Sequence, residues 1–245
     1  MAAVIPSRCR LLLTLAALPL ATVPLAAATI DPINDLRLGI SIAPVPYVHE
    51  DIATNGGSGS YDWKQNRYPG GVGVHLDLGW WHATSDAAGT WTPVWMVGVN
   101  YATTDITPDS YDVGSGTVSN NREDLSVRYK QYGVALGYGV ATSAYPSEIG
   151  DLHWEFMPFV RGGIAKAETT SPGANPVVGS GTGRWWEGGL EAGLVLAADH
   201  WILNPFISGS FGKFNADIAL PNNTTSDMTI TTFGPKIGLR VGGRF

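Results

Sequence analysis

Three glutamates are spaced so that their carboxyl groups could act together in acid–base chemistry. Glu187 and Glu191 lie four residues apart, and residues separated by an even number point to the same side of an extended chain. Glu155 lies on the corresponding side of the preceding apolar segment. Two neighbouring carboxyl groups can serve as general acid and general base. A catalytic interpretation therefore has to be weighed against a structural one.

The structural interpretation depends on other charged residues that share the orientation of these glutamates. They are Arg37, Asp77, Arg161, Lys236 and Arg240. Together with the glutamates they make four cations and four carboxylates. Charges removed from water cost several kcal/mol unless they are paired. We therefore predict that these eight side chains form ion pairs inside the protein, and we expect no catalytic residue among them.

Two other polar groups could also be functional sites. His49, Glu50 and Asp51 are adjacent, but neighbouring residues on an extended chain diverge, and no serine motif accompanies them. The stretch 102–127 holds five acidic residues without the spacing and turn glycine of a calcium loop. We interpret both groups as polar loop sequence. The sequence predicts no cofactor and no metal site.

Composition narrows the class of protein. The 245 residues carry 15 basic and 21 acidic side chains, a net charge of −6, which argues against a nucleic-acid surface. Charged residues make up 15%, below the roughly 25% of soluble domains, and 31 residues are glycine. After residue 28 no apolar run approaches the ~20 residues that a membrane-spanning helix needs. An all-β protein is the class that remains.

Residues 1–28 have the three parts of a secretory signal peptide. Two arginines precede an apolar core over 11–25, and alanines at 26–28 suit a signal peptidase. The single cysteine, Cys9, lies before the apolar core and would be removed with the peptide. The predicted mature domain, 29–245, would then contain no disulfide, thiolate zinc site or cysteine nucleophile.

From residue 36 onward, apolar side chains alternate with small or polar ones in eight segments. The last segment is the clearest, with Phe233 and Ile237 on one side and Lys236 and Arg240 on the other. A period of two puts the two sets on opposite faces of a β-strand. The segments are 36–43, 72–80, 95–101, 132–140, 154–164, 186–196, 203–215 and 233–245. The two faces of the seventh segment are the least distinct.

The connections between the segments alternate in length. Short ones lie near 82–92, 142–151 and 198–202, and long ones near 48–67, 102–127, 166–184 and 216–228. One face of the segments is bulky and apolar. The other is mostly glycine, alanine and serine, unlike the wetted surface of a soluble barrel or sandwich. The sequence therefore predicts an eight-stranded antiparallel up-and-down β-barrel that crosses a membrane with its bulky face toward lipid.

Aromatic residues lie at both ends of the predicted strands, where a transmembrane barrel has its two girdles. Those at the short-turn ends are Trp80, Trp91, Tyr145, Trp154 and Trp201. Those at the long-loop ends are Tyr68, Tyr101, Tyr129, Trp185 and Trp186. The long loops together hold eleven acidic residues, which argues against capture of DNA or of anionic ligands.

The signal peptide, the alternating strands and the terminal strand resemble the small outer-membrane barrels of the OmpA, OmpX and OmpW type. The resemblance covers residues 36–245 and does not reach a subfamily. The end of the chain resembles the C-terminal signal read by the barrel assembly machinery, through Ile237, Leu239, Val241 and Phe245. The resemblance implies an outer-membrane location, with membrane lipids, lipopolysaccharide and the assembly machinery as partners.

The sequence favours a membrane-structural or surface-interaction role without catalysis, and a lumen closed by the paired charges. The alternative is a narrow channel for small or hydrophobic solutes, which the resemblance to the OmpW type allows. A third alternative, a lipid-modifying barrel enzyme, has no motif in its support. Fold alone does not choose among these roles, and no loop partner can be identified.

Overall fold

The computed structural model describes ten stretches of the chain: 33–43, 47–54, 57–64, 73–83, 91–106, 110–112, 117–119, 126–170, 179–220 and 224–245. The predicted signal peptide lies outside them, so the boundary at residue 28 stays a prediction. Within these stretches, no helix combines the length and the apolar character that crossing a membrane would require.

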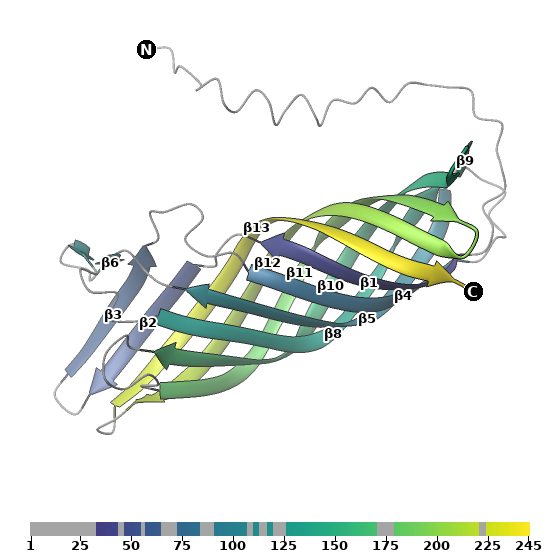
Figure 1. Ribbon diagram of the computed structural model, residues 1–245. Helices are drawn as coiled ribbons and strands as arrows, with labels where there is room; N and C mark the ends of the chain where they lie inside the picture. Colours follow the sequence, from purple (N-terminus) through teal and green to yellow (C-terminus); the bar gives the residue numbers. More distant parts are fainter. Residues whose placement is uncertain are drawn as a thin grey trace, which may run out of the picture.

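Eight antiparallel strands form a closed ring (Figure 1). In order around the ring they are β1 (Asn34–Ala43), β4 (Gly73–His82), β5 (Trp91–Ile106), β8 (Ser126–Thr142), β10 (Gly150–Thr170), β11 (Gly179–Ala198), β12 (Trp201–Leu220) and β13 (Thr224–Arg244). The ring closes because β1 pairs with β13 as well as with β4. The predicted eight-stranded antiparallel up-and-down barrel is confirmed.

In the part of the chain that the structure describes, five shorter strands accompany the ring: β2 (Tyr47–Thr54), β3 (Gly57–Lys64), β6 (Ser110–Asp112), β7 (Thr117–Ser119) and β9 (Tyr145–Ser147). β2 and β3 form a hairpin, and β2 pairs with the first part of β13, beyond the end of β1. Figure 1 shows the hairpin at the end of the barrel opposite the C-terminus. The prediction that His49, Glu50 and Asp51 belong to a loop is therefore wrong, because all three lie on β2.

At this end the ring strands continue over 102–106, 126–131, 165–170, 179–185, 212–220 and 224–232, and of these residues only 212–215 were predicted as strand. With the β2–β3 hairpin and β6, we call these strand segments the distal wall. Inward and outward side chains still alternate there, but the apolar residues now point into the barrel and the polar residues point outward. On β8, for example, Tyr129 is buried and Arg128 is exposed. Polar residues toward water have the composition of a loop, which is why much of the distal wall was predicted as loop.

The register between strands sets the tilt of the barrel. A row of paired residues that starts at Pro93 on β5 passes once round the ring and returns to β5 at Thr103, ten residues further along. In an eight-stranded ring this stagger corresponds to strands inclined by about 40° to the barrel axis. Each residue then advances about 2.5 Å along the axis, and each strand step along a row rises about 3 Å.

Between the two ends of the barrel, side chains alternate across the wall as predicted. Outward apolar side chains are half exposed, such as Leu38 at 55% and Val134 at 60%. The same alternation orients β12, the seventh strand of the ring. Its Ile207 and Phe211 face outward, and its Phe206 and Ser208 are buried in the barrel.

The outward apolar side chains form a continuous belt. On β10 the belt runs from Trp154 to Ile164, about 33 Å along the strand and about 25 Å along the barrel axis. Outer-membrane barrels have an apolar band of this height, about 25 Å. An apolar belt of this size is not stable in water, so the barrel spans a membrane. Closed β-barrels of this kind are those of bacterial outer membranes.

Two aromatic girdles border the belt. All five side chains predicted for the short-turn end are exposed. The outward aromatic side chains at the other end are Tyr101, Tyr132, Trp186, Phe211 and Phe233, which we call the upper girdle. Tyr129 and Trp185 are each only 3% exposed and lie inside the barrel, so their predicted place in the girdle is wrong. Tyr68 lies outside the described residues.

Among the described residues, two larger apolar clusters fill parts of the interior, and a third contains only Val195, Ala197 and Ile202. Inside the distal wall, Ile106, Tyr129, Trp185 and Phe214 belong to a buried cluster of twelve residues. A second cluster includes Trp81, Met96, Met157 and Phe159, and its members from the ring come from β4, β5, β8 and β10. The remaining space, at the level of the belt, holds the charged side chains.

Candidate functional site

The lumen at belt level contains three tiers of ion pairs. They are numbered from the end of the barrel at which the C-terminus lies. In the first tier, Arg37 is fully buried and donates from Nη1 and Nη2 to the two carboxylate oxygens of Glu155, at 2.6 and 2.7 Å. Its Nη2 also donates to Asp35 at 2.8 Å. Arg244 Nε donates to the other oxygen of Asp35 at 3.1 Å. Two-point contacts between guanidinium and carboxylate are strong and directional, so this tier joins β1, β10 and β13.

The second tier is centred on Arg240. Its Nε donates to Asp77 at 2.7 Å, and its Nη2 donates to Glu191 at 2.8 Å, with a further contact from Nη1 to the same carboxylate. Arg161 also approaches Glu191, with 4.0 Å between Nη2 and Oε2. Its guanidinium lies 4.5 Å from the centre of the Phe159 ring.

Two uncharged side chains connect the first and second tiers. The indole ring of Trp81 lies 4.7 Å from the guanidinium carbon of Arg37 and 4.9 Å from that of Arg240. The amide oxygen of Asn204 accepts from both guanidinium groups at 3.4 Å. The two cations therefore share neutral neighbours as well as having carboxylates of their own.

The third tier is the pair of Lys236 and Glu187, whose side chains are both almost fully buried. Beside it is a cavity of about 20 Å³, lined among others by His75, Gln131 and Ser210. A cavity of this size holds about one water molecule. On the distal side of this tier is the apolar cluster inside the distal wall.

Small residues make room for the long charged side chains. On β13, Gly238 lies between Lys236 and Arg240. On β1, a Cβ atom at Gly39 would lie 2.5 Å from Asp77 Oδ1 and 2.8 Å from Arg240 Cγ. Gly39 is therefore a position where charged side chains cross the lumen, whereas at Gly238 a Cβ atom would meet Phe206 and Ser41.

All eight charged residues singled out in the sequence lie in these tiers, and each lies within 4.0 Å of a charge of opposite sign. Sequence reasoning missed Asp35, Arg244, Trp81 and Asn204. Arg244 continues the spacing of Lys236 and Arg240, and Asp35 has the orientation of Arg37, so both had a detectable signal. Trp81 and Asn204 had none, because their role depends on which strands face each other across the lumen.

The tiers are poorly suited to acid–base catalysis, because every carboxylate in them is engaged by a cation. Within the described residues, the buried side-chain atoms without a hydrogen-bond partner include Nε of both Arg37 and Arg161, Asn100 Oδ1 and Ser208 Oγ. Arg161 is nevertheless less fully paired than Arg37 or Arg240, because its carboxylate contact is 4.0 Å long, whereas the other two donate hydrogen bonds to carboxylates at 2.6–2.8 Å. Among the same residues, no group of three or more histidine, cysteine or acidic side chains could hold a metal ion.

A second polar group lies on the outer face of the β2–β3 hairpin. His49 Nδ1 lies 2.5 Å from Asp62 Oδ1, and His49 Nε2 lies 3.5 Å from Ser60 Oγ, which is the order of a Ser–His–Asp triad. Asp51 Oδ2 lies 3.4 Å from the same Nε2. The hydrogen bond to Asp62 and the charge of Asp51 raise the pKa of His49 above its usual value. Asp51 lies as close to Nε2 as Ser60 does, so this nitrogen is not reserved for the serine hydroxyl.

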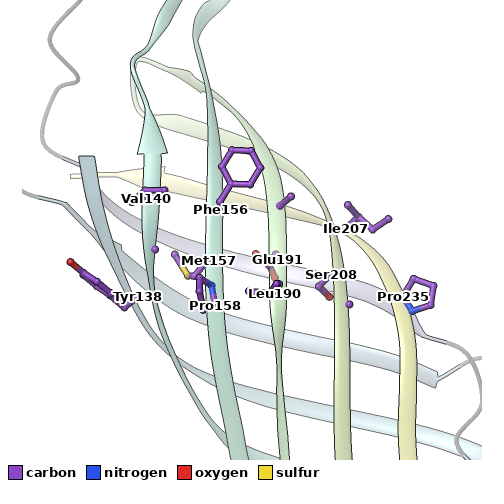
Figure 2. A pocket seen from close by; sticks show the side chains of 13 residues that line it. Tyr138, Val140, Phe156, Met157, Pro158, Leu190, Glu191, Ile207, Ser208 and Pro235 are labelled. Carbon is purple, nitrogen blue, oxygen red and sulfur yellow. The ribbon is translucent and has the colours of Figure 1, made fainter. Parts of the chain in front are cut away.

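A groove of about 780 Å³ crosses the outside of the barrel at belt level. Figure 2 shows Tyr138, Phe156, Pro158, Leu190 and Pro235 along it, on neighbouring strands. Tyr138 is on β8 and Phe156 on β10, and the shorter side chains of Leu190, Ile207 and Pro235 follow on β11, β12 and β13. Its lining is almost entirely apolar, as expected of a surface in contact with lipid acyl chains.

No family model and no curated protein matches this sequence. Among solved structures, the chain is similar to a major outer membrane protein from Thermus thermophilus, at 16% identity and a TM-score of 0.45, covering 86% of this chain and 99% of that one. It is similar to the outer membrane protease OmpT from Escherichia coli, at 9% identity and a TM-score of 0.43, covering 90% and 100%. It is also similar to the outer membrane protein OprG from Pseudomonas aeruginosa, at 13% identity and a TM-score of 0.38, covering 87% and 97%. Similarity at this level concerns the fold alone.

Proposed function

We propose that this outer-membrane barrel has a membrane-structural or surface-interaction role and that its lumen is closed to ions. The main support is the pairing of charges in the three tiers. A selective ion pore is expected to carry an excess of charge of one sign, whereas the tiers are balanced. The interior of an eight-stranded barrel is only wide enough for side chains or one small ligand. Side chains of the size of Arg37, Arg240 and Trp81 therefore leave little space for a permeating ion.

The part of the protein available to partners is the distal wall with its connecting loops. It continues the barrel beyond the upper girdle, with polar side chains outward and an apolar core inside. A wall of this kind can present a folded surface outside the membrane. In this proposal the partners are outer-membrane lipids and lipopolysaccharide around the belt, the assembly machinery during biogenesis, and an unidentified ligand of the loops.

The alternative function is a narrow channel for small or hydrophobic solutes. The observation in its favour is the incomplete pairing around Arg161, with an unpartnered Nε atom and a distance of 4.0 Å to Glu191. A catalytic role has less support. Within the described residues, the arrangement at His49 resembles a triad, but its Nε2 lies between Asp51 and Ser60 instead of facing the serine alone.

Single-channel recording of the refolded protein in planar bilayers tests the closed lumen, and liposome swelling tests passage of neutral solutes. We expect neither a steady current nor swelling above that of protein-free liposomes. The double variant E187S/K236S keeps the charge balance, removes the third tier and leaves the other two, so we expect it to remain closed as well. Stable open channels, or solute-dependent swelling, from the wild type would instead support the channel.

A further inference from the structure

Four cations lie on the outer face of the distal wall, immediately beyond the upper girdle. They are Lys130 on β8, Lys166 on β10, Arg184 on β11 and Lys213 on β12. We call them the basic arc. Their strand neighbours Tyr129, Ala165, Trp185 and Phe214 are buried in the barrel, so the four cations point outward. The four strands follow one another in the ring, which makes the arc continuous.

The register places the basic arc at one height. Lys166 pairs directly with Lys130, and Lys213 pairs directly with the girdle residue Trp186. From the axial rise per residue and per strand step, the four residues lie within about 4 Å of one another along the barrel axis and about 5 Å beyond the girdle. The polar headgroup region extends about 5–8 Å beyond each side of the hydrocarbon core. The arc therefore lies at headgroup level.

The basic arc has more positive charge than its own carboxylates neutralise. Glu168 lies 3.5 Å from Lys130 Nζ and 2.6 Å from Lys166 Nζ, so one carboxylate serves two lysines. Within the described part of the chain, Arg184 and Lys213 form no ion pair and are exposed. Like charges directly opposite each other on paired strands, such as Lys130 and Lys166, are unfavourable without a counter-charge. An anion from outside the protein would relieve this excess.

The basic arc lies on one side of the barrel, from β8 to β12. On β12, β13 and β2, further from the girdle, Asp217, Asp227 and Asp51 are opposite one another in the register. When charges are summed along the sequence, acids such as these outweigh the basic residues, and the sum argues against an anionic ligand. Asp217 is on β12 like Lys213 but four residues further from the girdle, and Asp227 and Asp51 are on other strands. The two groups are therefore separated by height, and that argument does not apply to the basic arc.

We propose that the basic arc binds the phosphate groups of anionic lipid headgroups in the outer leaflet. The proposal rests on the proposed membrane role of the barrel, and it gives the lipid partner a chemical group and a binding site. Lysine and arginine side chains form charge-assisted hydrogen bonds with phosphate oxygens. Trp186 and Phe211, next to the arc in the girdle, would contact the same lipid below its headgroup.

Native mass spectrometry of the refolded protein in a neutral detergent tests the proposal. The probes are lipid A with two phosphates and the same lipid after enzymatic removal of its phosphates. We expect the phosphorylated lipid to form the more abundant complex with the wild type. The double variant R184Q/K213Q should weaken this complex roughly 25-fold, about fivefold for each cation removed, and should leave the dephosphorylated lipid unaffected.

Two control variants separate a local site from a general charge effect. R184K/K213R keeps both charges and should bind like the wild type. D227N changes the net charge by one unit, but Asp227 lies about 10 Å beyond the arc along the barrel axis. This variant should therefore change binding less than twofold. Equal binding of the two lipids, or a change in D227N as large as in R184Q/K213Q, would overturn the proposal. A conducting lumen would overturn the closed barrel and leave this result intact, because the arc is on the outside.

Discussion

At the residue scale, the number of carboxylates around each buried cation predicts how much each pair contributes. Lys236 pairs with Glu187 alone, whereas Arg240 pairs with both Asp77 and Glu191. We expect E187A to lower the free energy of unfolding by about 3–5 kcal/mol, because it leaves an uncompensated buried ammonium. We expect D77A to lower it by less, because Arg240 keeps its contacts with Glu191. Urea unfolding of the vesicle-refolded barrel, followed by heat-modifiable mobility, measures both.

The matched control is E168A, which removes a carboxylate from an exposed pair of lysines. Exposed ion pairs contribute about 0–1 kcal/mol, so E168A should unfold close to the wild type. If E187A and E168A unfold at the same urea concentration, Lys236 must be hydrated in the folded barrel, and the closed lumen loses its main support.

The identity of the buried charges could be predicted from the sequence, but their partners could not. A period of two and the sign of each charge place Arg37 and Glu155 on the inner face. Their pairing also requires the stagger of the ring, because the two residues are 118 positions apart and lie on strands that are not neighbours. The same reason explains why Trp81, between two guanidinium groups, was missed.

At the scale of single elements, the β2–β3 hairpin should respond to pH. Asp62 and Asp51 raise the pKa of His49, so the folded hairpin favours the protonated imidazole. The resulting stabilisation is fully present below the unfolded-state pKa of about 6.5 and is lost as pH rises through the higher folded-state value. We expect amide hydrogen exchange over 47–54 and 57–64, corrected for its intrinsic pH dependence, to become faster above that value.

The variant H49N removes the titrating group and keeps a polar side chain on β2. Its hairpin should exchange at a rate that does not change with pH after the same correction. A wild-type hairpin without pH dependence, or one whose pH dependence persists in H49N, would mean that another group is responsible.

The strands of the belt were predictable from alternation, whereas the distal wall was not. On β8, Tyr132, Val134 and Leu136 face lipid, and alternation of bulky and small residues identifies the strand. Further along the same strand the outward residues are Arg128 and Lys130, and the inward ones are Val127 and Tyr129. The apolar residues thus change from the outward to the inward face within one strand. A prediction that follows a single bulky face therefore ends the strand too early.

At the scale of the whole molecule, the distal wall should face the outside of the cell. An epitope tag inserted at 55–56, between β2 and β3, should be labelled on intact cells. A tag at the turn formed by Glu148 and Ile149, at the opposite end of the barrel, should be labelled only after permeabilisation. The reverse pattern would invert the orientation.

The terminal residue should matter for assembly more than for stability. Phe245 is 80% exposed and ends the outward row of β13, so its deletion removes little packing within the barrel. We expect the deletion to lower the amount of heat-modifiable protein in the outer membrane. The purified deletion variant, refolded in vesicles, should unfold at the same urea concentration as the wild type. Wild-type amounts in the membrane would refute the assembly signal.

The height of the belt limits the bilayers that this barrel can occupy. Its apolar surface measures about 25 Å along the axis and ends at aromatic rings, with the basic arc directly beyond them. In a bilayer with a thicker hydrocarbon core, lysine and arginine side chains would be drawn into acyl chains, or the lipids would have to thin around the protein. Spontaneous insertion should therefore be efficient in dilauroyl phosphatidylcholine and fall in dioleoyl phosphatidylcholine. Hydrophobic mismatch of this kind would keep the barrel in thin membranes and out of thicker ones.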